Sequence, residues 1–136
     1  MTMRGWITSP AVRGLALLAL CGAYLQGGLV KLMDFDAAQA EMAHFGLHPA
    51  HLAAAAVILL ELGACALILT GRLRWLGALA LAVFTAAAAL MANRYWEAPA
   101  DARFMLMNAF YEHIGLAGAW VLVAWHDLTE RTHGRS

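Results

Sequence analysis

The chain has 136 residues, of which 62% are hydrophobic and only 13% are charged. That is too little polar surface to cover a water-soluble globule of this size, so the composition favours a protein that lies in lipid. Nine basic and nine acidic side chains give no net charge, which argues against a nucleic-acid binder.

Four apolar stretches are long enough to cross a bilayer as helices, since about 20 residues cover ~30 Å of hydrocarbon. They are residues 12–33, 51–70, 73–93 and 105–126. Short links join them, and only Gly71-Arg72 separates the second stretch from the third. Helices joined by such links are antiparallel neighbours. The sequence therefore predicts an all-α fold, an integral membrane four-helix bundle of up-down topology, in a single domain over residues 1–136.

The link of residues 34–50 has the pattern of a short helix lying at the membrane surface. Its apolar side chains recur at helical spacing and form one stripe, with acidic and amide side chains off that stripe. The stripe consists of Phe35, Ala38, Met42 and Phe45. Because Gly46 and Pro49 end a helix, we expect a short interfacial helix between spans one and two.

Basic residues predict the orientation of the chain, because cytoplasmic loops of membrane proteins carry an excess of Lys and Arg. One side holds Arg4, Arg13, Arg72, Arg74, Arg131 and Arg135. The other side holds Lys31, Arg94 and Arg103. The larger group predicts that both termini lie in the cytoplasm.

Polar side chains within the spans indicate a candidate site, because a charge at membrane depth costs about 2.5–3.5 kcal/mol. At a rise of ~1.5 Å per residue, Glu61 lies near the midplane of the bilayer. The same rise places polar side chains from the other three spans at similar depth, with Asn108 one turn above. These are Tyr24, Gln26, Thr85, Glu112 and His113. We expect part of this layer to line a pocket open toward the outer side.

The roles of these residues follow from their chemistry. An acidic group at the midplane and an imidazole that titrates near neutrality suit proton exchange, so Glu61 and His113 are the candidate catalytic residues. The candidate binding residues are Tyr24, Gln26, Lys31, Trp96, Asn108 and Glu112. Tyr24 and Lys31 share one stripe of span one, whereas Gln26 lies ~200° from Tyr24 and cannot face the same pocket.

A structural interpretation stands beside the functional one. Buried Tyr, Gln, Asn and Thr side chains often hydrogen-bond neighbouring helices, and Glu61 can serve as the structural partner of Lys31, Gln26 or His113. Cys21 and Cys65 lie in apolar runs and form no CxxC motif, so they are inert buried thiols or, alternatively, a membrane redox pair. We expect no metal site, because breaks at Gly46 and Pro49 separate the nearby histidines.

Four segments of the chain have a familiar order and spacing: LQGGLVKLMDF, ELGACALILTG, NRYWEAP and FMLMNAFYEHIGLAGAWVLVA. Together, over about residues 12–126, they resemble the DoxX family of bacterial four-helix membrane proteins. Glu61 stands where that family usually has an acid, and the step from Gly28 to Lys31 and the pair Tyr95-Trp96 also resemble the family pattern. Glu112-His113 departs from the family pattern, because many members have a Lys-Asn pair at this position, before the glycines of span four.

The resemblance implies a bacterial inner membrane protein associated with redox chemistry, since family members look tied to thiosulfate oxidation coupled to quinone. Glu61, with His113 or Lys31, would then bind the oxygens of a quinone or other small lipophilic molecule and exchange protons. The alternative is a non-catalytic scaffold that anchors a soluble redox enzyme through residues 34–50 or the cytoplasmic tail. No cofactor motif is evident, and quinone is the candidate ligand. The expected partners are the lipid bilayer, a soluble redox protein and a second copy of the chain.

Overall fold

The computed structural model describes residues 2–134, and the regular elements in this range are all helices, with no strand. The elements are α1 (Met3–Ile7), α2 (Pro10–Met33), α3 (Phe35–His44), α4 (Ala50–Thr70), α5 (Arg74–Ala92), η1 (Tyr95–Glu97) and α6 (Ala100–His133). The predicted all-α class is confirmed, and α3 occupies the link where a short helix was expected. Helices α1 and η1 were not predicted, and Arg135 lies outside the described residues.

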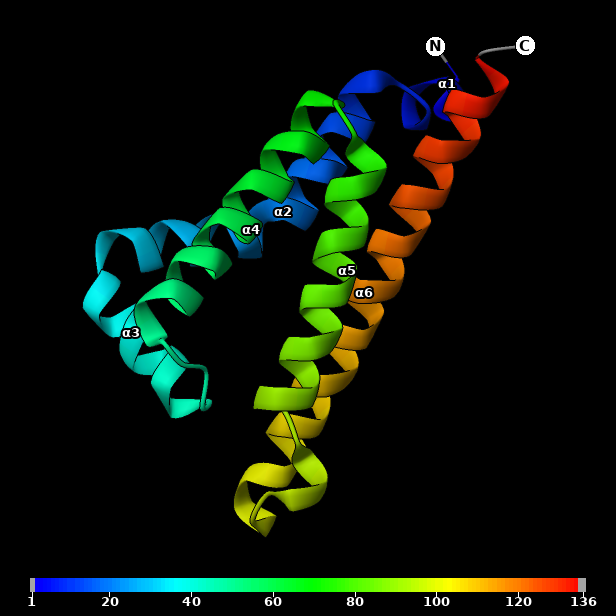
Figure 1. Ribbon diagram of the computed structural model, residues 1–136. Coiled ribbons are helices and arrows are strands. Elements are labelled where there is room, and N and C mark those ends of the chain that lie inside the picture. Colours follow the sequence, from blue (N-terminus) through cyan, green and yellow to red (C-terminus); the bar gives the residue numbers. More distant parts are fainter. Residues whose placement is uncertain (1, 135–136) are drawn as a thin grey trace.

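Three segments within residues 2–134 are long and apolar enough to cross a membrane: α2, α4, and residues 74–97 around α5. The predicted fourth span, in α6, does not meet the same criterion, although α6 is 34 residues long. Asn108, Glu112 and His113 interrupt its apolar stretch and lower its mean hydropathy. Because α6 runs beside α5 (Figure 1), the fourth span stays a prediction that this geometry supports.

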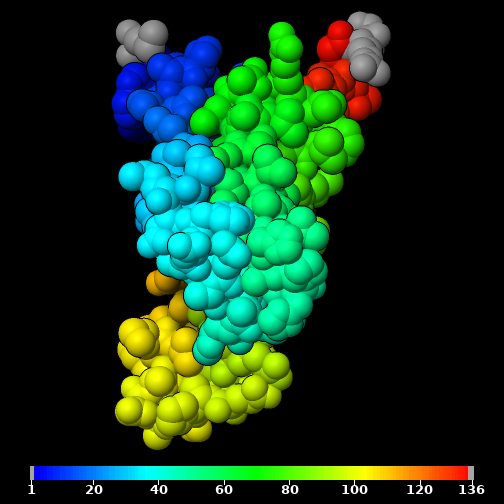
Figure 2. All heavy atoms as spheres, turned by 60° about the vertical axis from the view of Figure 1, so that its left-hand side comes forward, coloured from blue at the N-terminus to red at the C-terminus, as the bar shows by residue number. Residues whose placement is uncertain are grey.

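The helices form two arms that diverge along the molecule (Figure 1). Helices α2, α3 and α4 make one arm, and α5 with α6 makes the other. Both termini lie at the end where the arms meet, which we call the N/C end, and we call the opposite end the distal end. Figure 2 shows α3 and the start of α4 side by side, with η1 and the start of α6 projecting beyond them at the distal end.

The turn between α4 and α5 is clamped to α6 by charged side chains. Gly71 takes a positive φ of 79° there, a conformation that favours glycine. Arg131 donates hydrogen bonds to the Gly71 carbonyl at 2.8 Å and to Asp127 at 2.9 Å. Asp127 also accepts from the backbone N–H of Trp75 at 3.0 Å, and so caps the first turn of α5 from a neighbouring helix.

Glycines lie at close contacts between neighbouring helices at two crossings. A Cβ on Gly77 of α5 would lie 2.7 Å from the carbonyl oxygen of Ala64 on α4. A Cβ on Gly28 of α2 would lie 2.7 Å from the Leu62 side chain on α4. Both distances are below van der Waals contact. The backbone oxygen beside Gly77 cannot move aside, so α4 packs against α5 at a distance that only glycine permits, whereas the flexible Leu62 side chain beside Gly28 could shift.

The main core lies where the two arms meet. Its buried residues come from four helices and are Leu17, Cys21, Tyr24, Ala64, Cys65, Ile68, Ala78, Leu81, Ala82, Trp120 and Ala124. The Cys65 thiol lies 3.8 Å from the Cys21 carbonyl oxygen, and both thiols are free and fully buried. A second cluster of Ala38, Met42 and Ala54 fixes α3 onto α4. The arms are therefore joined near the N/C end, and the distal half of each arm packs separately.

Candidate functional site

Lys31 and Glu61 form an ion pair between α2 and α4. The Lys31 ammonium donates a hydrogen bond to Glu61 Oε1 at 3.0 Å. The Glu61 side chain is only 5% exposed and the Lys31 side chain 17% exposed. A charge-assisted hydrogen bond in apolar surroundings offsets part of the cost of burying both charges. Each charge therefore depends on the other to remain in the protein interior.

Gly27 makes room for this ion pair. A Cβ at this position would lie 3.0 Å from Glu61 Oε2 and 3.4 Å from Lys31 Nζ. The missing side chain thus allows the carboxylate and the ammonium to meet over the surface of α2. Gly27 and Gly28 thus lie directly against side chains of α4 at the crossing that holds the buried charges.

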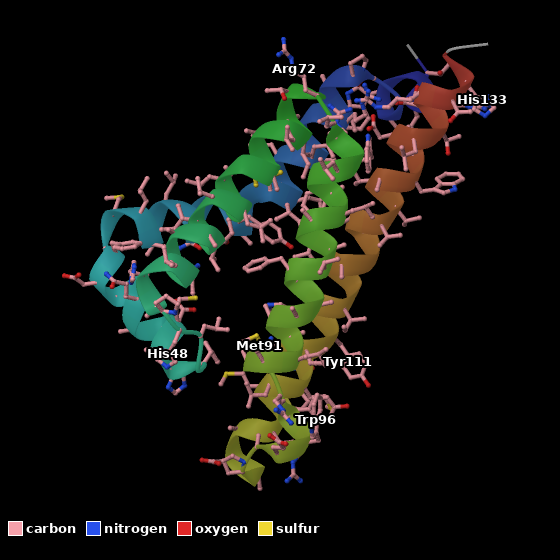
Figure 3. The ribbon with its side chains drawn as sticks, viewed as in Figure 1. His48, Arg72, Met91, Trp96, Tyr111 and His133 are labelled. Atoms are coloured by element: carbon pink, nitrogen blue, oxygen red, sulfur yellow. The ribbon has the colours of Figure 1, made fainter. Side chains whose placement is uncertain are left out.

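A pocket of about 250 Å³ lies between the two arms on the distal side of their junction. Its wall on α5 consists of Phe84, Ala87, Ala88, Met91 and Ala92. The facing wall, from α2, α3, α4 and the α3–α4 link, consists of Lys31, Glu41, Met42, Phe45, Leu47 and Val57. Figure 3 shows Met91 on α5 across the opening from the α3–α4 link, which carries His48. Lys31 thus lines a mostly apolar pocket while its ammonium bonds the buried carboxylate of Glu61.

Tyr24 belongs to a separate polar network in the core. Its hydroxyl makes a short hydrogen bond with Thr85 of α5 and accepts one from Trp120 Nε1 of α6 at 3.0 Å. All three side chains are buried, and the rings of Tyr24 and Trp120 pack edge to face. This network ties α2 to the α5–α6 arm, which corresponds to the structural interpretation of Tyr24 and Thr85.

We expect Tyr24→Phe to lower the free energy of unfolding in detergent micelles by about 1–2 kcal/mol, because Trp120 Nε1 and Thr85 both lose their partner. Unfolding in mixed micelles of increasing denaturing detergent, followed by circular dichroism, measures this change. Tyr111→Phe is the matched control, since Tyr111 is 59% exposed. Equal stability of the two variants would show that the network does not hold the arms together.

His113 lies level with the distal end of α5, closer to the end of that helix than the sequence count indicated. Its Nδ1 donates to the Ala109 carbonyl at 2.8 Å and lies 3.3 Å from the amide of Asn93, the residue that ends α5. The count started span four at residue 105, whereas α6 starts at Ala100 and its first turns extend beyond α5 (Figure 1). His113 therefore lies apart from the Lys31–Glu61 pair, and the residues before it lie still farther toward the distal end.

The other candidate residues are exposed on the surface of the molecule. Gln26 faces outward from α2, and Asn108 and Glu112 face outward from α6. Trp96, 47% exposed, packs edge to face on Tyr95 and Phe110 in an aromatic cluster at the distal end. Of the eight candidates, only Lys31 lines the pocket and only Glu61 contacts Lys31, so the expected polar layer separates into three groups.

Sequence patterns did not reveal the α5 wall of the pocket. Ala87, Ala88 and Met91 carry no chemical signature, and alanine-rich helix faces are normal at helix contacts. Glu41 was also missed as a lining residue of the pocket, because its position off the apolar stripe of α3 indicated that its side chain faces solvent. The signal that was available is the Gly27-Gly28 pair, which precedes a lysine by one turn and lies against the helix that bears Glu61.

The fold and site define a helical membrane protein with a buried ion pair beside a lipophilic pocket. The DoxX family model matches residues 14–94, from α2 to just beyond α5. The chain therefore belongs to the DoxX family, as its sequence segments indicated, although the match leaves α6 outside. It is also similar to inner membrane protein YphA of Escherichia coli (strain K12), with 29% identity over 115 residues, 85% of this chain and 82% of YphA. No solved structure matches the chain.

Proposed function

We propose that this chain is an inner membrane protein that binds a quinone, or a similar small lipophilic carbonyl compound, in the pocket between its two arms. The location follows the name of the YphA relative, and the basic residues around the N/C end favour termini in the cytoplasm. The observation that supports binding most directly is the position of Lys31. Lys31 lines a mostly apolar pocket while the buried carboxylate of Glu61 bonds its ammonium.

The ammonium of Lys31 has donors to spare for a ligand. One of its three N–H groups bonds Glu61, and the others can donate to a carbonyl oxygen in the pocket. A volume of about 250 Å³ is below that of common ligand sites, which hold ~300–1,000 Å³. The pocket therefore suits a single ring bearing carbonyl groups, with any apolar tail lying in the bilayer between the arms.

The same ion pair can support proton transfer. A quinone that takes up two electrons also takes up two protons. Lys31 can give one of them to a ring oxygen, and water supplies the second proton and the proton that restores Lys31. Glu61 then stabilises Lys31 as it regains its charge. The electrons come from a soluble redox partner at the membrane surface, which makes this chain a redox-associated component.

Photolabelling in liposomes tests the proposal. A short-chain photoreactive ubiquinone analogue is expected to label residues of the α5 wall in the native chain. Met91→Trp fills the pocket and should abolish labelling, whereas Leu90→Trp, on an exposed neighbour outside the pocket, should leave it unchanged. The double variant Lys31→Gln/Glu61→Gln should weaken binding about tenfold through the loss of a charge-assisted hydrogen bond.

The exposed ion pair of Arg94 and Glu97 supplies the matched control, because it lies outside the pocket at the same end of the molecule. Arg94→Gln/Glu97→Gln should bind the analogue like the native chain. Labelling that is unaffected by Met91→Trp would overturn the proposal. If the chain also still captured a soluble redox enzyme in a pull-down, the two results together would favour the non-catalytic scaffold.

A further inference from the structure

A groove at the N/C end, far from the pocket between the arms, is formed by two adjoining cavities. One is about 420 Å³ and the other about 450 Å³, and both are lined by Arg13, His126 and Glu130. Because they share these three residues, the two cavities adjoin along the seam between α2 and α6. We call the two cavities together the α2–α6 groove.

The α2–α6 groove combines apolar and charged side chains. The cavity of about 420 Å³ has an apolar part formed by Leu17, Leu122, Val123 and Trp125, which we call the apolar slot, and its lining also includes Arg13, Arg74, Asp127 and Glu130. The cavity of about 450 Å³ reaches Thr8 and Ser9, at the junction of α1 and α2. An apolar slot beside charged and hydroxyl side chains on membrane helices matches the two parts of a phospholipid, the acyl chain and the headgroup.

Two arginines line the cavity that holds the apolar slot, and Arg13 also lines the second cavity. Arg13 contacts both carboxylate oxygens of Glu130 at 3.3 Å, but each side chain is 49% exposed. An exposed ion pair of this kind holds its partner weakly, so the guanidinium is free to turn to a phosphate. Arg74 donates from Nε to the Ile68 carbonyl, which leaves its terminal N–H groups available for a phosphate. Asp127, the other acidic residue of the groove, already accepts hydrogen bonds from Arg131 and from the backbone of Trp75.

Aromatic side chains place this end of the molecule at a membrane interface. Trp6 on α1 and Trp125 on α6 are 61% and 63% exposed, as is typical of tryptophans at the headgroup level. We propose that the α2–α6 groove binds one phospholipid with an anionic headgroup, its phosphate on Arg13 and Arg74 and one acyl chain along Leu17 and Leu122. This site is independent of the quinone pocket.

Native mass spectrometry of the purified full chain tests this assignment. We expect phosphatidylglycerol to remain bound to the delipidated protein at lower concentration than phosphatidylethanolamine with the same acyl chains. Arg13→Gln should weaken phosphatidylglycerol binding about fivefold, the effect expected of one basic residue near an anionic lipid surface. Glu130→Gln frees Arg13 and should strengthen it. Arg94→Gln, at the distal end, should have no effect.

Two further experiments distinguish a bound lipid from other ligands of the groove. Inorganic phosphate should not displace phosphatidylglycerol, because it lacks the acyl chain that fills the apolar slot. Leu122→Trp should block that slot, whereas Val121→Trp, on an exposed neighbour outside the groove, should not. Equal binding of the two lipids to the native chain, or no response to both Arg13→Gln and Leu122→Trp, would overturn the proposal.

Discussion

Replacing Lys31 with Met while Glu61 remains is expected to lower the free energy of unfolding by about 3–5 kcal/mol. The Glu61 carboxylate is only 5% exposed, so the loss of its hydrogen-bonded partner leaves a buried charge without compensation. Reversible unfolding in mixed micelles, followed by circular dichroism, measures the difference.

The double variant Lys31→Met/Glu61→Met separates the cost of an unpaired charge from the loss of packing. We expect it to be close to the native chain in stability, because two apolar side chains of similar volume fill the same space. Arg94→Met is the control for loss of an exposed ion pair and should cost about 1 kcal/mol or less. A single Lys31→Met variant as stable as Arg94→Met would mean that the pair does not hold α2 against α4.

Gly77→Ala is expected to destabilise the contact between α4 and α5 by about 1–3 kcal/mol. The added methyl group would lie 2.7 Å from the Ala64 carbonyl oxygen, 3.1 Å from Ile68 Cγ1 and 3.2 Å from Leu67 Cβ. A backbone oxygen inside a helix cannot move aside, so the two helices must separate. The same unfolding measurement applies, with the yield of folded protein after extraction as a second readout.

Gly63→Ala on α4 is the matched control, and its expected effect has the opposite sign. A Cβ at Gly63 meets nothing within 4 Å. Alanine is favoured over glycine in a helix interior by up to ~1 kcal/mol, so this variant should be neutral or slightly stabilised. Equal changes in the two variants would indicate that helix propensity, rather than contact with Ala64, governs both positions.

Local chemistry in the sequence predicted most of the helices. The apolar runs, and the break at Gly46 and Pro49, were sufficient to place α2, α4, α5 and α3 within a few residues of their observed ends. The pairing of Lys31 with Glu61 was also among the stated alternatives, since a buried charge needs a partner. These features depend on composition, spacing and the cost of charge in lipid, all of which a single sequence carries.

Features that depend on how helices slide and tilt were not predictable in the same way. Depth counted from the start of an apolar run cannot show that the first turns of α6 extend beyond α5. For this reason His113 and Glu112 lie closer to the distal end than the count indicated. The clamp of Asp127 and Arg131 on the α4–α5 turn depends on contacts between distant segments. The divergence of the arms is likewise a tertiary property.

The divergence of the two arms decides how the affinity of the pocket should be measured. A compound that enters between α3, α4 and α5 comes from the surrounding lipid, where a long-tailed molecule is far more concentrated than in water. Its occupancy then depends on its mole fraction among the membrane lipids, whose own acyl chains compete for the same space. A modest intrinsic affinity would be sufficient under these conditions, and a dissociation constant expressed per litre of water would overstate the affinity of the protein for such a compound.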